Sequence, residues 1–234
     1  RQHLSADERI ALASPASWIS SKTEPVKTPQ ISPILETLDP VLKLTPDTAI
    51  RDFCVDDASL EGQNMEGVVF RSGQFTRASF RDASLPRLEL SDVRLLDCDL
   101  ANAQLVDASL LRVELTRCRL IGTRLTECYL QDVRLTNCVA KLSQFRFSKL
   151  ISCHFDGCDL RDTDFQGADL TNALFTACDL RNVEMSQAIL TGTDLTSSNI
   201  EGLRVNQESL KGLILEPHQA ASVASLFGVK VRWT

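Results

Sequence analysis

The chain has 234 residues, which suits one domain with or without an arm, and its 25 basic and 31 acidic side chains give a formal net charge of −6. This acidic balance argues against a general nucleic-acid binder, which needs a basic stripe to neutralise phosphates. No apolar run approaches the roughly 20 residues of a membrane span, so we expect no membrane span.

Residues 1–49 form the first predicted segment, a Pro-rich arm that holds six of the eight prolines. The stretch "SADE" (Ser5–Glu8) is a capping box that predicts a short helix. Residues 14–30 are typical of an extended linker. Ser32-Pro33 and Asp39-Pro40 predict two single helical turns that cap the first coil of the segment that follows. We expect such an arm to dock onto a neighbour in a larger assembly.

A period of five residues runs from Ile50 to Leu215, where every fifth position, 34 in all, is apolar. The residue two positions before each of them is small from Val93 to Ser198. An α-helix would spread this period around its surface, because 3.6 does not divide five. A chain that turns a corner every five residues accommodates it. Four sides then make a coil of 20 residues that stacks on the next coil at ~4.8 Å.

The segments "CDLRD", "TDFQG", "ADLTN" and "TDLTS" resemble the repeats of the pentapeptide-repeat protein family, whose unit is roughly A(D/N)LXX. The resemblance covers residues 50–215. It implies an all-β solenoid, a right-handed quadrilateral parallel β-helix of about eight coils. It says little about function, because the motif is a packing rule.

Seven of the eight cysteines occupy the small inward position of this pattern. We interpret them as small apolar core residues rather than as a metal or disulfide ladder, because a straight column does not converge on one point as zinc ligands do. Free thiols in this number favour a reducing compartment. The structural ladder, with members 20 residues apart, consists of Cys98, Cys118, Cys138, Cys158 and Cys178.

The sequence contains few candidate residues for a catalytic or metal site. His154 follows Cys153, but neighbours on an extended segment point to opposite sides, so we expect His154 to face solvent. Asp162 and Asp164 are explained as surface positions of an ordinary repeat rather than as paired catalytic carboxylates. We therefore predict no enzyme, no catalytic residue, no cofactor and no metal site.

The outer surface becomes acidic beyond Leu150, since residues 50–150 hold 14 acidic and 14 basic side chains whereas residues 151–215 hold 10 and 4. Like charges stack one coil apart in this half, and Arg204 is expected to reach only one of the two stacked pairs. Such a surface is either simply solvated or kept for a cationic partner. The candidate acidic partner surface consists of Asp159, Asp164, Asp179 and Glu184.

Some pentapeptide-repeat proteins imitate duplex DNA and occupy the DNA site of bacterial type II topoisomerases. DNA carries one charge per ~1.7 Å of axis, and residues 151–215 reach one per ~2.6 Å at ~4.8 Å per coil. The resemblance therefore leaves DNA mimicry open for this half of the rod.

Apolar residues occupy outward positions near the middle of the rod. They either fold over a coil narrowed at Ala140 or form a docking patch, since contiguous exposed apolar area marks an interface. The candidate patch consists of Leu111, Ile121, Val139, Leu142, Phe147 and Ile151.

Residues 216–234 predict a C-terminal cap. Pro217 suits the first helical position, Gly228 the helix stop, and Val229 to Val231 a closing strand. The segment resembles the end of topoisomerase-protecting family members, which implies an end-to-end homodimer in which Trp233 could pack.

From these features we predict a non-enzymatic interaction or scaffold protein, a structural or accessory component of a larger assembly. The alternative is a DNA mimic that binds a type II topoisomerase through its acidic half. Both hypotheses imply protein partners and no direct contact with nucleic acid. The chain begins with Arg1 rather than Met, which leaves removal of an N-terminal piece open. The family's occurrence suggests the thylakoid lumen of plastids, whereas the thiols favour the cytoplasm.

Overall fold

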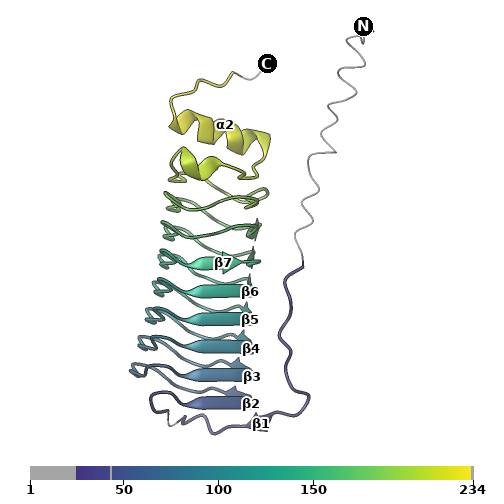
Figure 1. Ribbon diagram of the computed structural model, residues 1–234, viewed down its shortest axis with the longest axis vertical. Coiled ribbons are helices and arrows are strands. Elements are labelled where there is room, and N and C mark those ends of the chain that lie inside the picture. The colour runs from purple at the N-terminus through teal and green to yellow at the C-terminus, as the bar shows by residue number, and fades with distance from the viewer. Residues whose placement is uncertain (1–24, 43, 233–234) are drawn as a thin grey trace.

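The computed structural model describes residues 25–42 and 44–232, which form a parallel all-β solenoid of about seven turns with a helix on its last coil (Figure 1). The predicted fold class is confirmed. The elements are β1 (Glu36–Thr37), β2 (Ala49–Asp56), β3 (Val69–Thr76), β4 (Glu89–Leu96), β5 (Ser109–Thr116), β6 (Tyr129–Thr136), β7 (Lys149–Ile151), β8 (His154–Asp156), β9 (Leu174–Thr176), η2 (Glu208–Leu210) and α2 (Pro217–Leu226).

Each coil pairs with the next in parallel, 20 residues further along the chain. Ala49 of β2 pairs with Val69 of β3, and the same step continues to β6. β7 and β8 both pair with β6, and β9 pairs with β8. Isolated bridges extend the register on the other sides as far as Asp194 and Ile214. Every coil is therefore hydrogen-bonded to its neighbours, as in other solenoids.

The corners explain the period of five. A left-handed backbone recurs at every fifth residue, for example at Asp92 (φ 58°), Asn102 (φ 58°) and Gly122 (φ 67°). Glycine adopts this conformation freely, and Asn and Asp adopt it more readily than other residues. Asn102 lies over Gly122 one coil on, where an added Cβ would come within 2.8 Å of its amide oxygen. The corners thus fix both the turn of the chain and the stacking of the coils.

The apolar positions fill the interior with stacked rings and leucines. The rings of Phe145 and Phe165, one coil apart, stack with centroids 4.9 Å apart. Buried hydroxyls at the small inward positions are satisfied by carbonyls of the preceding coil, as when Thr123 Oγ1 donates to the Leu100 carbonyl at 2.7 Å. The inward side chains fill the interior of the rod. We therefore look for a functional site on the outer surface or at the ends of the rod.

The N-terminal arm differs from the expectation. Helical turns were expected after Ser32 and Asp39, but residues 25–42 and 44–49 contain bends and strand β1 instead. β1 pairs with β2, where Glu36 lies opposite Phe53. A strand satisfies the open backbone edge of the first coil, which a helical turn would leave unpaired. Leu44 is buried against the same coil. The helix predicted at Ser5–Glu8 lies outside the described residues.

The C-terminal cap contains the predicted helix α2. Glu216 is its N-cap residue and Pro217 its first residue, and Gly228 follows the helix in a left-handed conformation (φ 80°). The expected closing strand is absent among the described residues, because residues 229–232 form no strand and Val229 is 54% exposed. α2 and η2 already cover the last coil, so the chain leaves it after Gly228. Trp233 lies outside the described residues.

Candidate interaction surfaces

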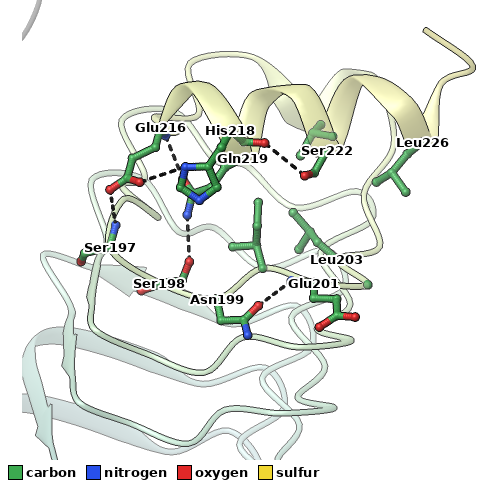
Figure 2. Close-up of a pocket in the computed structure, with 13 residues that line it drawn as sticks. Ser197, Ser198, Asn199, Glu201, Leu203, Glu216, His218, Gln219, Ser222 and Leu226 are labelled. Carbon is green, nitrogen blue, oxygen red and sulfur yellow. Dashed lines mark hydrogen bonds and ion pairs between the residues drawn. The ribbon is translucent and has the colours of Figure 1, made fainter. Parts of the chain in front are cut away.

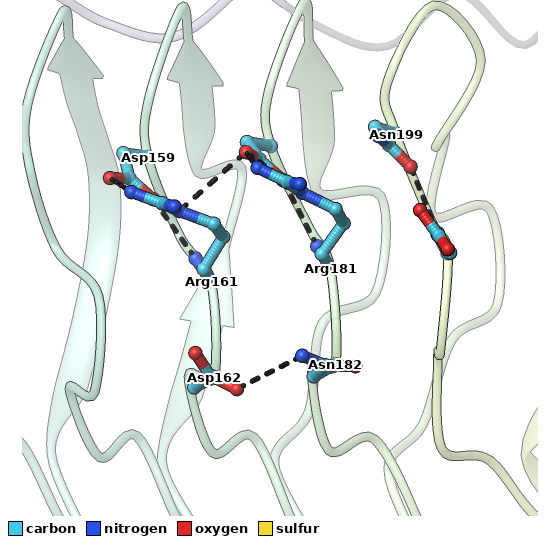
Figure 3. A network of polar contacts seen from close by, with 8 residues as sticks. Asp159, Arg161, Asp162, Arg181, Asn182 and Asn199 are labelled. Carbon is cyan, nitrogen blue, oxygen red and sulfur yellow. Dashed lines mark hydrogen bonds and ion pairs between the residues drawn. The ribbon is translucent and has the colours of Figure 1, made fainter.

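Asp159 and Asp179 stack one coil apart, and we call this pair the acidic column. Both carboxylates are paired with arginines (Figure 3). Arg161 donates to Asp159, two residues before it, at 2.8 and 2.7 Å, and Arg181 binds Asp179 in the same way at 2.9 and 2.7 Å. Arg161 Nε also lies 3.6 Å from the Asp179 carboxylate, which links the two coils. The stacking of Asp159 on Asp179 was predicted correctly, but the i+2 arginines that neutralise it were overlooked.

The second acidic pair is also neutralised. Arg146 Nε lies 3.6 Å from Asp164, and Arg204 Nε lies 3.3 Å from Glu184. Hydrogen bonds from Arg161 and Arg181 lower the pKa of Asp159 and of Asp179 below its usual value. The four carboxylates therefore do not form a bare anionic strip, and the acidic excess of residues 151–215 lies on other side chains.

The six residues of the candidate apolar patch do not lie together. Leu111 and Ile151 share one column of the sheet with Gln131 between them, while Val139 bridges Arg119 and Asp159 on another side. Ile121 and Leu111 are only partly exposed. The most exposed members are Leu142 at 53% and Phe147 at 52%.

Leu142 and Phe147 lie at opposite corners of one side of the rod. Leu142 lines a shallow groove of about 410 Å³ with Gln144, and Phe147 lines a second groove of about 480 Å³ that also reaches Gln144. The Phe147 ring is held over the glycine of the next coil, with the Arg146 guanidinium 5.6 Å from its centroid. We name this side, with Leu142, Gln144 and Phe147, the waist.

The cysteine ladder is buried and makes hydrogen bonds within the rod. Cys118 Sγ donates to the Leu95 carbonyl at 3.4 Å, and its four ladder partners contact the carbonyl 23 residues earlier in the same way. This is the contact that Thr123 makes with its hydroxyl. Burial raises the pKa of the Cys128 and Cys153 thiols to about 12. All eight cysteines are free, and in the described part of the chain no three His, Cys, Asp or Glu side chains are placed to share a metal.

His154 lies on the outside of β8 but is only partly exposed. Its Nε2 atom is buried with no hydrogen-bond partner in the described structure, and Arg134 occupies the paired position one coil earlier. Burial and the Arg134 charge lower the pKa of His154. The expectation that it faces solvent freely is therefore only partly met.

The C-terminal end carries a cleft that sequence reasoning missed. A cleft of about 550 Å³ lies between the last coil and α2 (Figure 2). Gln219 Nε2 holds the helix in place by donating to the Leu195 and Ser198 carbonyls, each at 2.8 Å. Leu226, on the rim, is 55% exposed. The cleft joins residues from a coil and from the helix, and only their spatial contact creates it.

The fold defines the class of protein as a β-solenoid built from five-residue repeats. The chain belongs to the pentapeptide-repeat family: residues 88–155 match the "Pentapeptide repeat region", and residues 141–176 and 173–207 match "Pentapeptide repeats (8 copies)". No curated protein sequence is similar enough to count as a match. No helix within residues 25–42 and 44–232 is long and apolar enough to cross a membrane.

Several solved structures are similar to this chain. A trypsin-treated form of QnrB1, a plasmid-mediated fluoroquinolone resistance protein, is 20% identical with a TM-score of 0.50 and covers 85% of this chain and 97% of its own. HetL, involved in heterocyst differentiation regulation in the cyanobacterium Nostoc, is 19% identical with a TM-score of 0.29 over 74% and 91% of the two chains. A protein of the Arabidopsis thaliana thylakoid lumen is 18% identical with a TM-score of 0.31 over 46% and 71%. At these identities the likeness concerns the fold alone.

Proposed function

We propose that this protein is a non-enzymatic scaffold that binds protein partners through the outside of its rod. The observation that carries the proposal is the contrast between a packed interior and the exposed apolar side chains of the waist. Leu142 and Phe147 are each more than half exposed although the repeat pattern places polar residues at most corners. Exposed apolar side chains beside grooves are features of protein interfaces.

The test is affinity capture with the full chain from its native source, at low and at raised salt, with quantitative identification of the bound proteins. Leu142→Ala and Phe147→Ala should lower the recovery of the partner while leaving the unfolding midpoint nearly unchanged. Ile189→Ala is the matched control, because Ile189 is also 53% exposed and lies on another side of the rod. Equal recovery with all three variants would refute the waist as the binding surface.

The acidic column supports a second candidate function, mimicry of DNA toward a type II topoisomerase. Stacking of Asp159 on Asp179 keeps two carboxylates one coil apart, about 4.8 Å. Their arginine partners weaken the case. If a topoisomerase is captured and is lost with salt and with Asp159→Asn and Asp179→Asn, the mimic replaces the scaffold as the function.

The C-terminal end supports an end-to-end homodimer. Four apolar side chains there are 40% to 55% exposed: Leu226, Phe227, Val229 and Val231. Sedimentation velocity should report a dimer that Phe227→Asp converts to a monomer. A monomer in the unmodified chain would exclude this contact.

A further inference from the structure

The segment before β1 lies along the rod instead of extending freely from it. Residues 25–32, which we call the strap, run beside the coils in an extended conformation (Figure 1). Three of its backbone N–H groups donate to side chains of the rod: Lys27 to Asp132 at 3.2 Å, Gln30 to Asp92 at 2.8 Å and Ser32 to Ser72 at 2.9 Å. Residues 25–30 of the predicted linker are therefore docked on the rod.

The three acceptor residues, with Arg112 between two of them, form one column at a corner of the rod. Ser72, Asp92, Arg112 and Asp132 follow one another at the 20-residue step and share a left-handed backbone. From Asp132 to Asp92 the rod descends two coils, about 9.6 Å at ~4.8 Å each, while the strap advances three residues. An extended, Pro-rich chain spans about 9.3 Å in three residues. The spacing of the column therefore matches an extended peptide.

Burial shows that the strap and the column are packed together. Val26 is 6% exposed, Pro29 is also buried, and Asp132 is 5% exposed. The side chains of the Arg112–Asp92 pair are 23% and 15% exposed, whereas those of the equally bidentate Arg117–Asp97 pair at a neighbouring corner are 55% and 38% exposed. The same ladder motif is thus covered at one corner and open at the other.

We propose that the column Ser72, Asp92, Arg112 and Asp132 is a binding site for an extended polypeptide, that the strap occupies it in cis, and that this docking holds the strap along the outside of the rod. Ser72, Asp92 and Asp132 accept hydrogen bonds from backbone N–H groups of the strap. The bonds to Asp92 and Asp132 are charge-assisted, which makes them stronger than neutral hydrogen bonds. Burial acts to raise the pKa of Asp92, but hydrogen bonds from Arg112 and from the Gln30 N–H outweigh it and lower that pKa.

The docked strap runs along several coils of the rod. β1 pairs at the level of Phe53, whereas Lys27 contacts the coil of Asp132, four coils or about 19 Å further on. Ile151 lies one coil beyond Gln131, the neighbour of Asp132, so the strap begins near the exposed middle of the rod. One side of the coil separates the corner of Phe147 from this column, so a partner that covers the waist and that side would also contact the strap; this consequence rests on the proposed function, whereas the docking does not.

The docking is tested by amide hydrogen exchange of Lys27 and Ser32, followed by NMR on the full chain. Gln30→Pro removes the N–H that binds Asp92 while an extended backbone remains compatible with proline. It should speed exchange of both amides at least tenfold. Thr28→Pro is the matched control, because the Thr28 N–H makes no hydrogen bond in the described structure and Pro29 already restrains Thr28 to extended conformations. It should leave both rates within about twofold.

Side-chain variants provide an independent test of the docking. Asp92→Ala with Asp132→Ala should release the strap, whereas Asp97→Ala, which also removes the partner of a bidentate arginine, should not. Ser72→Ala should speed exchange of Ser32 alone. If Lys27 and Ser32 exchange in the unmodified chain as fast as in an unstructured peptide, or if Gln30→Pro changes neither, the binding site is refuted.

The consequence for the partner is measured separately by affinity capture. Gln30→Pro should lower recovery of the partner that Phe147→Ala also lowers, and Thr28→Pro should not. Faster exchange of the strap amides with unchanged recovery of the partner would refute a contribution of the docked strap to partner binding. Capture that is insensitive to Phe147→Ala would instead refute the proposed function and leave the strap site intact.

Discussion

The ring of Phe147 lies over Gly167 in the next coil, so closely that a Cβ on the glycine would come within 2.6 Å of the ring. Phe147 itself has a left-handed backbone (φ 58°) and is 52% exposed. The glycine therefore serves two purposes: it turns the corner, and it provides the flat surface on which an exposed aromatic side chain is held at the waist.

Gly167→Ala should displace this ring and destabilise the rod. A side chain at φ +67° costs about 1–2 kcal/mol, and displacement of the ring should add up to about 1 kcal/mol. Urea unfolding and the ring-proton chemical shifts measure the two effects. Gly62→Ala is the control, because Gly62 has φ +65° but an added Cβ meets nothing within 4 Å. Equal losses for the two variants, with unchanged Phe147 shifts, would show that the ring does not rest on Gly167.

Arg161→Gln should raise the pKa of Asp159 toward its ordinary value of 3.8, because the hydrogen bond from Arg161 is the main cause of its lowering. A carboxyl with a lowered pKa stabilises the fold above its unfolded value, and this contribution is lost as pH falls through the lowered value. The variant should therefore be less stable than the unmodified chain near neutral pH, and this difference should shrink as pH falls through the lowered pKa of Asp159. Carboxyl carbon NMR titration measures the pKa directly. Arg71→Gln, whose partner is Glu89, should leave Asp159 unchanged.

The buried thiols should react only when the rod opens. Cys54 is partly exposed and should react first with a thiol reagent at about pH 8, whereas the seven buried cysteines should react at the unfolding rate. Because burial raises the pKa of Cys128 to about 12, its thiol stays protonated in the folded state while the unfolded state ionises above about pH 8.5. Stability should therefore fall as pH rises through this window, by about 1.4 kcal/mol per pH unit for each such thiol.

Cys128→Ser separates ionisation from packing. A serine at this position can donate to the Leu105 carbonyl as Cys128 does, and Ser148 makes the equivalent bond one coil on. The variant should fold and should show a shallower loss of stability above about pH 8.5. An identical alkaline slope would mean that Cys128 does not contribute to it.

Gln219→Ala should loosen the C-terminal cap. Its side chain is 2% exposed and satisfies the Leu195 and Ser198 carbonyls as well as the Glu216 N–H. Leaving such buried groups unpaired costs about 1–3 kcal/mol each. Hydrogen exchange within α2 should accelerate while exchange in β4 and β5 is retained. His218→Ala, which changes an exposed neighbour, is the control, and equal exchange in both variants would contradict this role.

The amino-acid pattern was sufficient to predict the solenoid, its register and the content of its core. The period of five predicts the stacking of Asp159 on Asp179 and the burial of the cysteine ladder, and the family follows from the resemblance of the repeat segments to its motif. The helix of the cap follows from local signals at Pro217 and Gly228. Each of these features depends on residues close in sequence or separated by a constant 20 residues.

The contacts between surface groups follow from the folded arrangement and not from the repeat pattern. The arginines of Asp159 and Asp179 approach from the same turn, and the six side chains of the candidate apolar patch divide among sides of the rod according to their column. The strap contacts residues 40 to 105 positions away at no repeated interval. No periodic pattern encodes such contacts, because the fit of an extended chain to a column depends on the rise of the stacked coils.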